Sequence, residues 1–241
     1  MMKTQNIELT VVARIHTGFP AKFGIPRQSG LVDTEGVIIF EPPFRNQDML
    51  RGIEEYSHLW IVWGFSESMG KEWHPTVRPP RLGGNQRMGV FATRSPFRPN
   101  PIGISCVKLE KADTENSEGP VLWVTGVDMM DGTPSYDIKP YLSYVDSIPE
   151  ASGGFSDRVK GYALEVDCPK RWMKMVPEAE RERLLQILSQ DPRPSYQNDP
   201  GRVYGMEYAG MEVRFRVESG RLIVCEVTCI NNGTGGKLYG I

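Results

Sequence analysis

The residues best suited to carry chemistry lie in one cationic segment, from Trp73 to Leu109. It holds five arginines and Lys108 but no Asp or Glu, so its local charge is +6. The whole chain sums to −2, which leaves −8 for the residues outside this segment. Positive charge concentrated in one segment predicts an anionic partner, and planar guanidinium groups match the geometry of phosphate. The five arginines are Arg78, Arg81, Arg87, Arg94 and Arg98.

The backbone of the cationic segment cannot form a continuous helix, because it contains six prolines and the pair Gly83-Gly84. Arginines held on stiff, irregular backbone lose less entropy when they meet phosphate. The alternative interpretation is a solvated, proline-rich surface loop whose charge is incidental.

Two polar sets follow further along the chain. Residues 131–134, Asp-Gly-Thr-Pro, have turn chemistry, because Asp caps its own backbone and Gly allows a positive φ. A plain hairpin turn explains them equally well. Asp137 and Lys139 alternate across one residue, so on a strand their side chains share a face. They form either a surface ion pair or, in a cleft, a base and the cation that tunes it.

Two more segments are candidates for a site. Residues 25–30 form a loop between the first two expected strands, and residues 56–63 form a strand rich in aromatic side chains. Such a strand belongs to the core in most proteins. Stacking of Trp60 and Trp63 on a nucleobase is the alternative, and His58 is expected to be a structural rather than a catalytic histidine.

Composition indicates an ordinary globular protein, with 39% hydrophobic and 24% charged residues in a chain of 241. The N-terminus lacks an apolar signal-peptide core, and no apolar run approaches the roughly 18 residues of a membrane span. We therefore expect a cytoplasmic protein that does not enter a membrane. The four cysteines include no CxxC pair and the three histidines are not spaced as metal ligands, so no metal is expected.

Short segments rich in β-branched and aromatic residues dominate the first 145 residues and indicate a barrel or sandwich. One helix is expected after Asn46, a suitable N-cap. The βαβ alternation and the GxGxxG motif of a dinucleotide-binding fold are absent from the sequence. The expected strands are residues 7–15, 36–41, 58–65, 89–94, 102–110, 120–128 and 135–139.

The expected fold is mainly β, with an N-terminal β-barrel in residues 1–148 and a smaller α+β C-terminal domain in residues 161–230. Residues 149–160 are small and polar and indicate a linker, and the Gly-rich residues 231–241 indicate a flexible tail. In the C-terminal domain we expect a helix opened by Pro177 and ending at Gln190. A hairpin follows in residues 211–217 and 222–230, with its turn at Ser219-Gly220.

Several motifs follow one another along the chain: PRQSG, YSHLWI, RPPRLGG, MGVFATRSPFRPNPIG, DGTP and DIKPYL. In this order they resemble the TrmO family of tRNA adenosine N6-methyltransferases, also called TsaA-like or YaeB-like. The resemblance covers about residues 5–145, and residues 189–196, SQDPRPSY, are similar to the C-terminal domain of bacterial members. It implies a β-barrel that binds S-adenosylmethionine, acts as a homodimer and methylates N6 of threonylcarbamoyladenosine at position 37 of tRNA, next to the anticodon.

The resemblance also implies which residues contact the methyl donor. They are Pro26, Arg27, Gln28, Ser66, Glu67, Arg94, Ile104, Asp131, Gly132, Thr133 and Pro134. Many relatives have His-Gln where this chain has Ser66-Glu67, so we expect contacts there through the backbone, or an electrostatic contribution from the Glu67 carboxylate. The other arginines of the cationic segment, Arg78, Arg81, Arg87 and Arg98, are the expected RNA contacts.

The chemistry of the implied reaction calls for a general base. The target nitrogen belongs to a ureido group and is a poor nucleophile until its proton is removed. Asp137 is the expected base, Lys139 its positive neighbour and Tyr141 a second candidate. Two other functions stay open on the sequence: a non-catalytic RNA-binding module that uses the same arginines, and an enzyme acting on the methyl donor itself.

Overall fold

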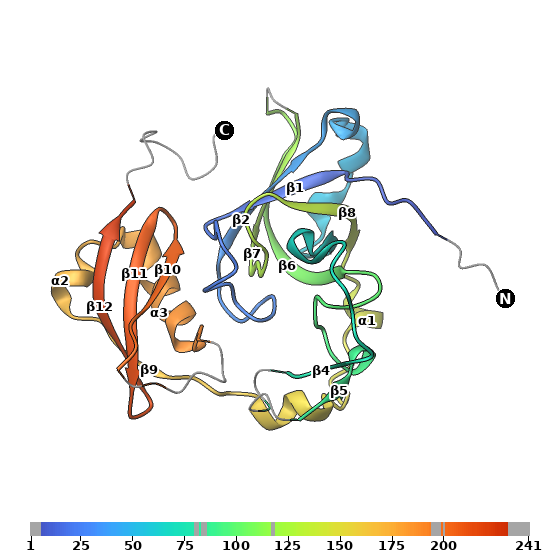
Figure 1. The fold of residues 1–241 in the computed structure, drawn as a ribbon. Helices are drawn as coiled ribbons and strands as arrows, with labels where there is room; N and C mark the ends of the chain where they lie inside the picture. Colours follow the sequence, from blue (N-terminus) through green and yellow to red (C-terminus); the bar gives the residue numbers. More distant parts are fainter. Residues whose placement is uncertain are drawn as a thin grey trace.

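The computed structural model describes residues 6–79, 82, 86–116, 119–193, 199 and 201–230. Figure 1 shows a closed β-barrel beside a separate four-stranded sheet that carries helices. This confirms the expected mainly β fold with an α+β C-terminal region. Arg81, the pair Gly83-Gly84 and the tail 231–241 lie outside the described residues.

The barrel closes six strands in the order β1-β2-β7-β6-β3-β8, and every neighbouring pair is antiparallel. Side chains alternate between the inside and the outside of the barrel, so Ile15, Ile38, Leu59, Ile61 and Leu122 fill its core. The strands are β1 (Ala13–Thr17), β2 (Glu35–Phe40), β3 (His58–Gly64), β6 (Ile102–Asp113), β7 (Val121–Thr125) and β8 (Thr133–Pro140).

Three connections between strands meet at one end of this barrel. The pairings Thr17 with Gly36, Glu35 with Thr125, and Trp63 with both Gly103 and Ser135 place the ends of β1, β3 and β7 at the same rim as the starts of β2, β6 and β8. The connections from β1 to β2, from β3 to β6 and from β7 to β8 therefore converge there.

Two strand expectations for the barrel half are wrong. Residues 89–94 do not form a strand: β5 (Met88–Gly89) pairs with β4 (Thr76–Val77), and a 3-10 turn follows at Val90–Ala92. Residues 7–12 precede β1, whose pairing with β2 begins at Ala13 opposite Phe40.

The expected helix after Asn46 is a pair of 3-10 turns, Gln47–Leu50 and Ile53–Glu55. Asn46 does act as the cap, because its side-chain oxygen accepts a hydrogen bond from the Asp48 amide at 2.9 Å. The helix cannot continue because Gly52 between the turns adopts φ = 84°, in the left-handed region.

The segment between the barrel and the sheet contains a short helix, α1 (Ser143–Asp146), and a 3-10 helix at Gly154–Val159. The C-terminal sheet has the order β10-β11-β12-β9, with β9 parallel to β12. Its elements are β9 (Glu165–Asp167), α2 (Lys170–Met173), α3 (Arg181–Ser189), β10 (Tyr204–Tyr208), β11 (Met211–Glu218) and β12 (Arg221–Cys229).

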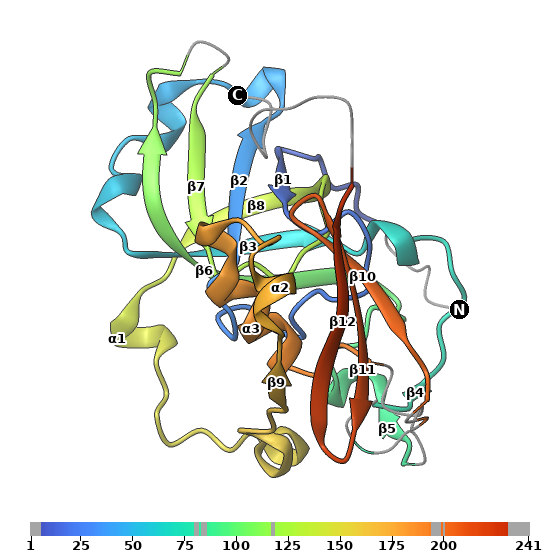
Figure 2. The same cartoon turned by 90° about the vertical axis from the view of Figure 1, so that its left-hand side faces the viewer.

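The expected C-terminal elements are confirmed. The helix after Pro177 begins with a 3-10 turn and continues as α3 to its cap at Gln190. The hairpin β11–β12, shown in Figure 2, turns at Ser219 and Gly220, whose φ values of 49° and 78° fit a two-residue type I′ turn. Among the described residues, no helix is long and apolar enough to cross a membrane.

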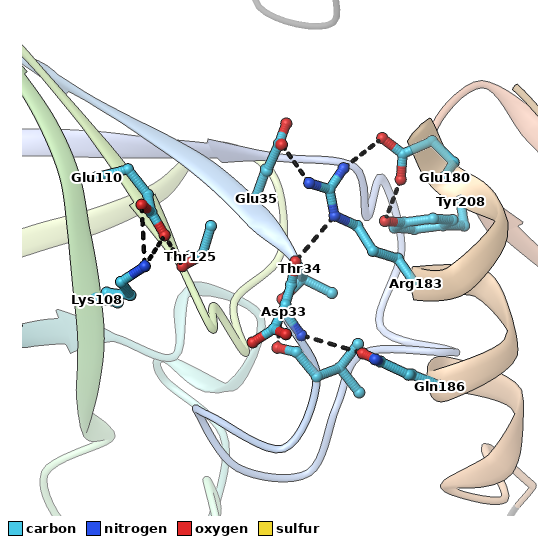
Figure 3. A network of polar contacts seen from close by, with 11 residues as sticks. Asp33, Thr34, Glu35, Lys108, Glu110, Thr125, Glu180, Arg183, Gln186 and Tyr208 are labelled. Atoms are coloured by element: carbon cyan, nitrogen blue, oxygen red, sulfur yellow. Dashed lines mark hydrogen bonds and ion pairs between the residues drawn. The ribbon is translucent and has the colours of Figure 1, made fainter. Parts of the chain in front are cut away.

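The two units share a hydrophobic core. Phe19 and Val32, from the long loop after β1, are buried in the same cluster as Leu184, Met206 and Phe215 of the C-terminal unit. Polar contacts lie beside this cluster: in Figure 3, Arg183 of α3 reaches Glu35 at the start of β2 as well as Glu180 before α3. The loop that leads into the barrel rim is therefore packed on the C-terminal unit.

Candidate active site

A pocket of about 470 Å³ lies at the barrel end where the three connections converge. Its volume is in the range typical of sites for small molecules and cofactors. Much of its wall is apolar, with contributions from Trp63, Phe65, Phe97 and Ile104. The polar and charged groups in the wall belong to Lys22, Arg27, Gln28, Ser66, Glu67, Ser68, Arg94, Arg98, Asp128 and Thr133.

Hydrogen bonds tie two of these loops together. The Arg94 guanidinium donates to the side-chain oxygen of Gln28, and the Gln28 amide nitrogen donates to the carbonyl of Arg27. The cationic segment is thereby linked to the loop before β2. Because Gln28 uses both ends of its amide, its orientation in the pocket wall is determined by these neighbours.

Arg27 is held by the C-terminal unit. Its guanidinium donates to the carbonyls of Asp191 and Arg193, at 3.1 and 3.2 Å. That loop is itself braced, because the Arg193 guanidinium forms two hydrogen bonds to the Asp191 carboxylate and Tyr162 donates a third. Burial opposes ionisation of Asp191, but the hydrogen bond and charge of Arg193 outweigh it, so the pKa of Asp191 lies below its ordinary value. Residues beyond the barrel thus hold one side chain of the pocket wall in place.

A buried polar chain reaches the pocket from the barrel interior. The Trp63 indole donates to the Ser105 hydroxyl at 2.9 Å, and that hydroxyl donates to the Asp128 carboxylate at 2.6 Å. The ring of Trp63 lies directly against Gly103, where a β-carbon would collide with it. The register that places Trp63 opposite Gly103 therefore also sets the position of Ser105.

The pKa of Asp128 is shifted well above its ordinary value. Its partial burial raises the pKa to about 6, although hydrogen bonds from Ser105 and from the backbone amides of Asp128 and Ser29, and the charge of Arg94, act in the opposite direction. Asp128 was not among the site residues expected from the sequence. The available signal was a carboxylate at the end of an expected buried strand, just before the Asp-Gly-Thr-Pro turn.

The Asp131 side chain links residues 131–134 to β1 by hydrogen bonds. The Asp131 carboxylate accepts a hydrogen bond from the Thr17 amide at 3.0 Å and lies 3.1 Å from a ring nitrogen of His16. Burial opposes ionisation of Asp131, but these two contacts lower its pKa below the ordinary value. Of the four turn residues, Thr133 lines the pocket, whereas Asp131, Gly132 and Pro134 do not. The turn fixes the loop that carries Asp128.

The expected catalytic residues lie elsewhere on the barrel. Asp137 and Lys139 do share a face of β8, where they form an ion pair of 2.9 Å between exposed side chains. Tyr141 packs against Trp60, with 5.9 Å between ring centroids. None of these three is among the residues that line the pocket.

The remaining expected contacts divide between the pocket and its surroundings. Pro26, Arg27, Gln28, Ser66, Glu67, Arg94 and Ile104 line the pocket, as does Arg98, which was expected to contact RNA. Glu67 is exposed and lies 3.8 Å from the ammonium of Lys22. Arg78 and Arg87 are exposed outside the pocket, and Arg81 lies outside the described residues.

The pocket suits a methyl donor of the size and charge of S-adenosylmethionine. Aromatic and aliphatic walls fit an adenine ring, and the carboxylates of Asp128 and Glu67 fit a molecule that carries a sulfonium and an ammonium group. The cations of Arg94, Arg98 and Lys22 fit its carboxylate. In the part of the chain that the structure describes, no group of three or more His, Cys, Asp or Glu side chains is arranged for a metal ion.

Comparison with known proteins identifies one family over both units. The family model described as tRNA-methyltransferase O N-terminal domain matches residues 14–147, and the TrmO C-terminal domain model matches residues 163–230. A curated tRNA (adenine(37)-N6)-methyltransferase from Eikenella corrodens is 47% identical over 180 residues, which are 73% of this chain and 98% of the relative.

Two Pseudomonas aeruginosa proteins extend the comparison. One, named putative S-adenosylmethionine-dependent methyltransferase RcsF, is 39% identical over 212 residues, 85% of this chain and 90% of its own. The other is a crystal structure of TrmO, which superimposes with a TM-score of 0.76 at 31% identity and covers 95% of this chain and 100% of its own.

Proposed function

The chain belongs to the tRNA-methyltransferase O family, and we propose that it methylates N6 of adenosine 37 in tRNA, with S-adenosylmethionine as the methyl donor. The observation that carries the proposal is the pocket at the barrel rim, into which the loops with the family's motifs converge. The relative from Eikenella corrodens, which this chain covers almost entirely, is named for this activity.

In this proposal the residues of the rim have different roles in binding the donor and in excluding water. Gln28 and Arg94, linked to each other, hold the donor, and Trp63 and Phe97 provide apolar walls that exclude water from it. Bound S-adenosylmethionine supplies an electrophilic methyl group on a sulfonium. The chain contributes orientation of the target nitrogen and a place for its proton.

The proposed substrate is the threonylcarbamoyl form of adenosine 37. Its side chain ends in a carboxylate, and Arg98 lines the pocket where such an anion would enter. The exposed Arg78 and Arg87 lie in the same cationic segment and would bind phosphates of the anticodon stem-loop. A cytoplasmic location is part of the proposal, because the proposed substrate is tRNA.

A homodimer is part of the proposal. Large apolar side chains stay exposed at the rim of the pocket in this single chain, the most exposed being Phe91 at 79%. An exposed apolar cluster beside a polar site is typical of an interface. The other members of the cluster are Phe97, Ile102 and Ile104.

The test uses the full chain, methyl-labelled S-adenosylmethionine and two tRNA transcripts, one carrying threonylcarbamoyladenosine at position 37 and one unmodified. Mass spectrometry of the digested nucleosides should find a single added methyl group on N6 of the modified adenosine. Calorimetry should detect donor binding without RNA. Absence of donor binding would leave the RNA-binding module as the better interpretation, whereas equal methylation of both transcripts would remove the threonylcarbamoyl group from the proposal.

A further inference from the structure

The reaction needs a base, because N6 of an adenosine acylated as a urea shares its lone pair with a carbonyl group. Such a nitrogen attacks a methyl group effectively only as its proton leaves. A base must lie in the pocket where the donor and the target meet. The carboxylates among the described residues that line this pocket belong to Asp128 and Glu67.

Glu67 is a poor candidate, since its side chain is exposed and lies near the Lys22 ammonium. Asp137 carries the ion pair with Lys139 on another part of the barrel surface. Asp128, by contrast, is partly buried and faces the pocket from the loop between β7 and β8. We propose that Asp128 is the general base that accepts the N6 proton, an inference that rests on the proposed function.

The hydrogen-bond directions around Asp128 fit this role. An indole nitrogen can only donate, so the Ser105 oxygen accepts from Trp63 and its proton points to Asp128. The backbone amides of Ser29 and Asp128 also favour the ionised form of Asp128. A carboxylate has about four acceptor sites, so the bond from Ser105 leaves acceptor sites for a proton donor in the pocket.

The ionisation of Asp128 fits as well. A pKa raised to about 6 keeps the group largely ionised at neutral pH and makes it a stronger base than an exposed Asp. Arg94 is the charged neighbour that lowers this pKa. The other charged side chains lining the pocket are those of Lys22, Arg27, Glu67 and Arg98.

The step balances without a further reactant. The N6–H bond breaks and its proton forms an O–H bond on Asp128, while the nitrogen pair forms the N6–CH₃ bond. The sulfur–methyl bond breaks with its pair on sulfur, so the sulfonium becomes a neutral thioether as the carboxylate becomes a neutral acid. Release of the proton to water restores Asp128.

The alternative is that Asp128 only holds the loop against β6 through Ser105. The experiment therefore compares the wild type with Asp128→Asn, which keeps the size and one oxygen that can accept from Ser105, and with Asp113→Asn, a control at a half-buried carboxylate that is paired with Lys111 and does not line the pocket. Single-turnover methylation is measured from pH 5 to 9, and affinity for S-adenosylhomocysteine is measured by calorimetry. Carbon NMR of labelled aspartate carboxyl groups gives the pKa of Asp128 independently of activity.

We expect Asp128→Asn to lower the rate about 100-fold or more, to abolish the inflection near pH 6 and to change the affinity by less than about threefold. Asp113→Asn should behave as the wild type. Ser105→Ala removes a bond to the ionised form, so it should raise the pKa of Asp128 and move the inflection to higher pH.

Several results would overturn the inference. They are an unchanged rate and inflection in Asp128→Asn, a loss of affinity as large as the loss of rate, or an inflection that disappears in Asp137→Asn instead. Should Asp128→Asn fail to fold, an inflection that does not move in Ser105→Ala overturns the inference by itself. Failure of the proposed function is distinct, because the wild type would then form no methylated product at any pH.

Discussion

Replacement of Arg183 by Met should weaken the packing of the C-terminal unit on the barrel and lower the free energy of unfolding. Its guanidinium donates to Glu180 and to the Asp33 carbonyl, both at 3.0 Å, and to the Glu35 carboxylate (Figure 3). Glu180 also accepts a hydrogen bond from Tyr208 at 2.7 Å. One side chain thus links α3 to the loop that leads into the barrel rim.

The size of the loss in the free energy of unfolding follows from how deeply the partners of Arg183 are buried. The side chains of Arg183 and Glu180 are 20% and 10% exposed, so loss of the arginine leaves a nearly buried carboxylate without its cation. Removing one member of a buried pair costs about 3–5 kcal/mol. The Glu35 side chain is 44% exposed and contributes about 0–1 kcal/mol. Since the pair is not fully buried, we expect a loss of about 3 kcal/mol in the free energy of unfolding.

Urea denaturation followed by tryptophan fluorescence and circular dichroism measures this loss. In a Glu180→Gln background the same replacement should cost only about 1 kcal/mol, because no buried charge is left behind. Arg221→Met is the matched control: the Arg221–Glu165 pair is 50% and 69% exposed and should contribute less than about 1 kcal/mol. Equal losses in both backgrounds would refute the explanation by buried charge.

Three further predictions concern the pocket. Arg94→Ala should weaken donor binding by about 1.5–3 kcal/mol in calorimetry, whereas Arg87→Ala should reduce the slope of log tRNA affinity against log salt by nearly one; parallel losses of both ligands in both variants would contradict this division. Because the pKa of Asp128 is raised to about 6, the folded state holds its proton more tightly and wild-type stability falls as pH rises from about 4 to 6. Asp128→Asn should therefore be more stable than the wild type by about 1–3 kcal/mol at pH 7 but not below pH 4. A difference in the free energy of unfolding that stays the same at all pH values in urea denaturation would contradict this. Gly103→Ala should push the Trp63 ring away from Ser105 and cost about 1–3 kcal/mol, visible as a lower Tm and altered fluorescence; an unchanged Tm would show that the ring has room.

The sequence predicted the parts of the fold that depend on local patterns. Expected strands at residues 36–41, 58–65 and 102–110 match β2, β3 and β6, because short runs of β-branched and aromatic residues favour extended backbone. The hairpin with Ser219-Gly220 matches because its turn type depends on two residues. Residues 89–94 were misassigned, since β-branched and aromatic residues there indicated a strand although the chain turns after pairing with β4.

The amino-acid sequence alone identified the parts of the site: arginines concentrated in one segment, family motifs in three connections and two strands, and a mainly β scaffold. The tertiary structure was needed to show which of these residues meet. Closure of the barrel brings the segments around Gln28, Phe65, Arg94 and Asp128 to one rim, and packing on the C-terminal unit supplies the carbonyls that hold Arg27. The physical reason is that strand register and the desolvation that raises the pKa of Asp128 depend on contacts between residues far apart in the chain, which no local pattern encodes.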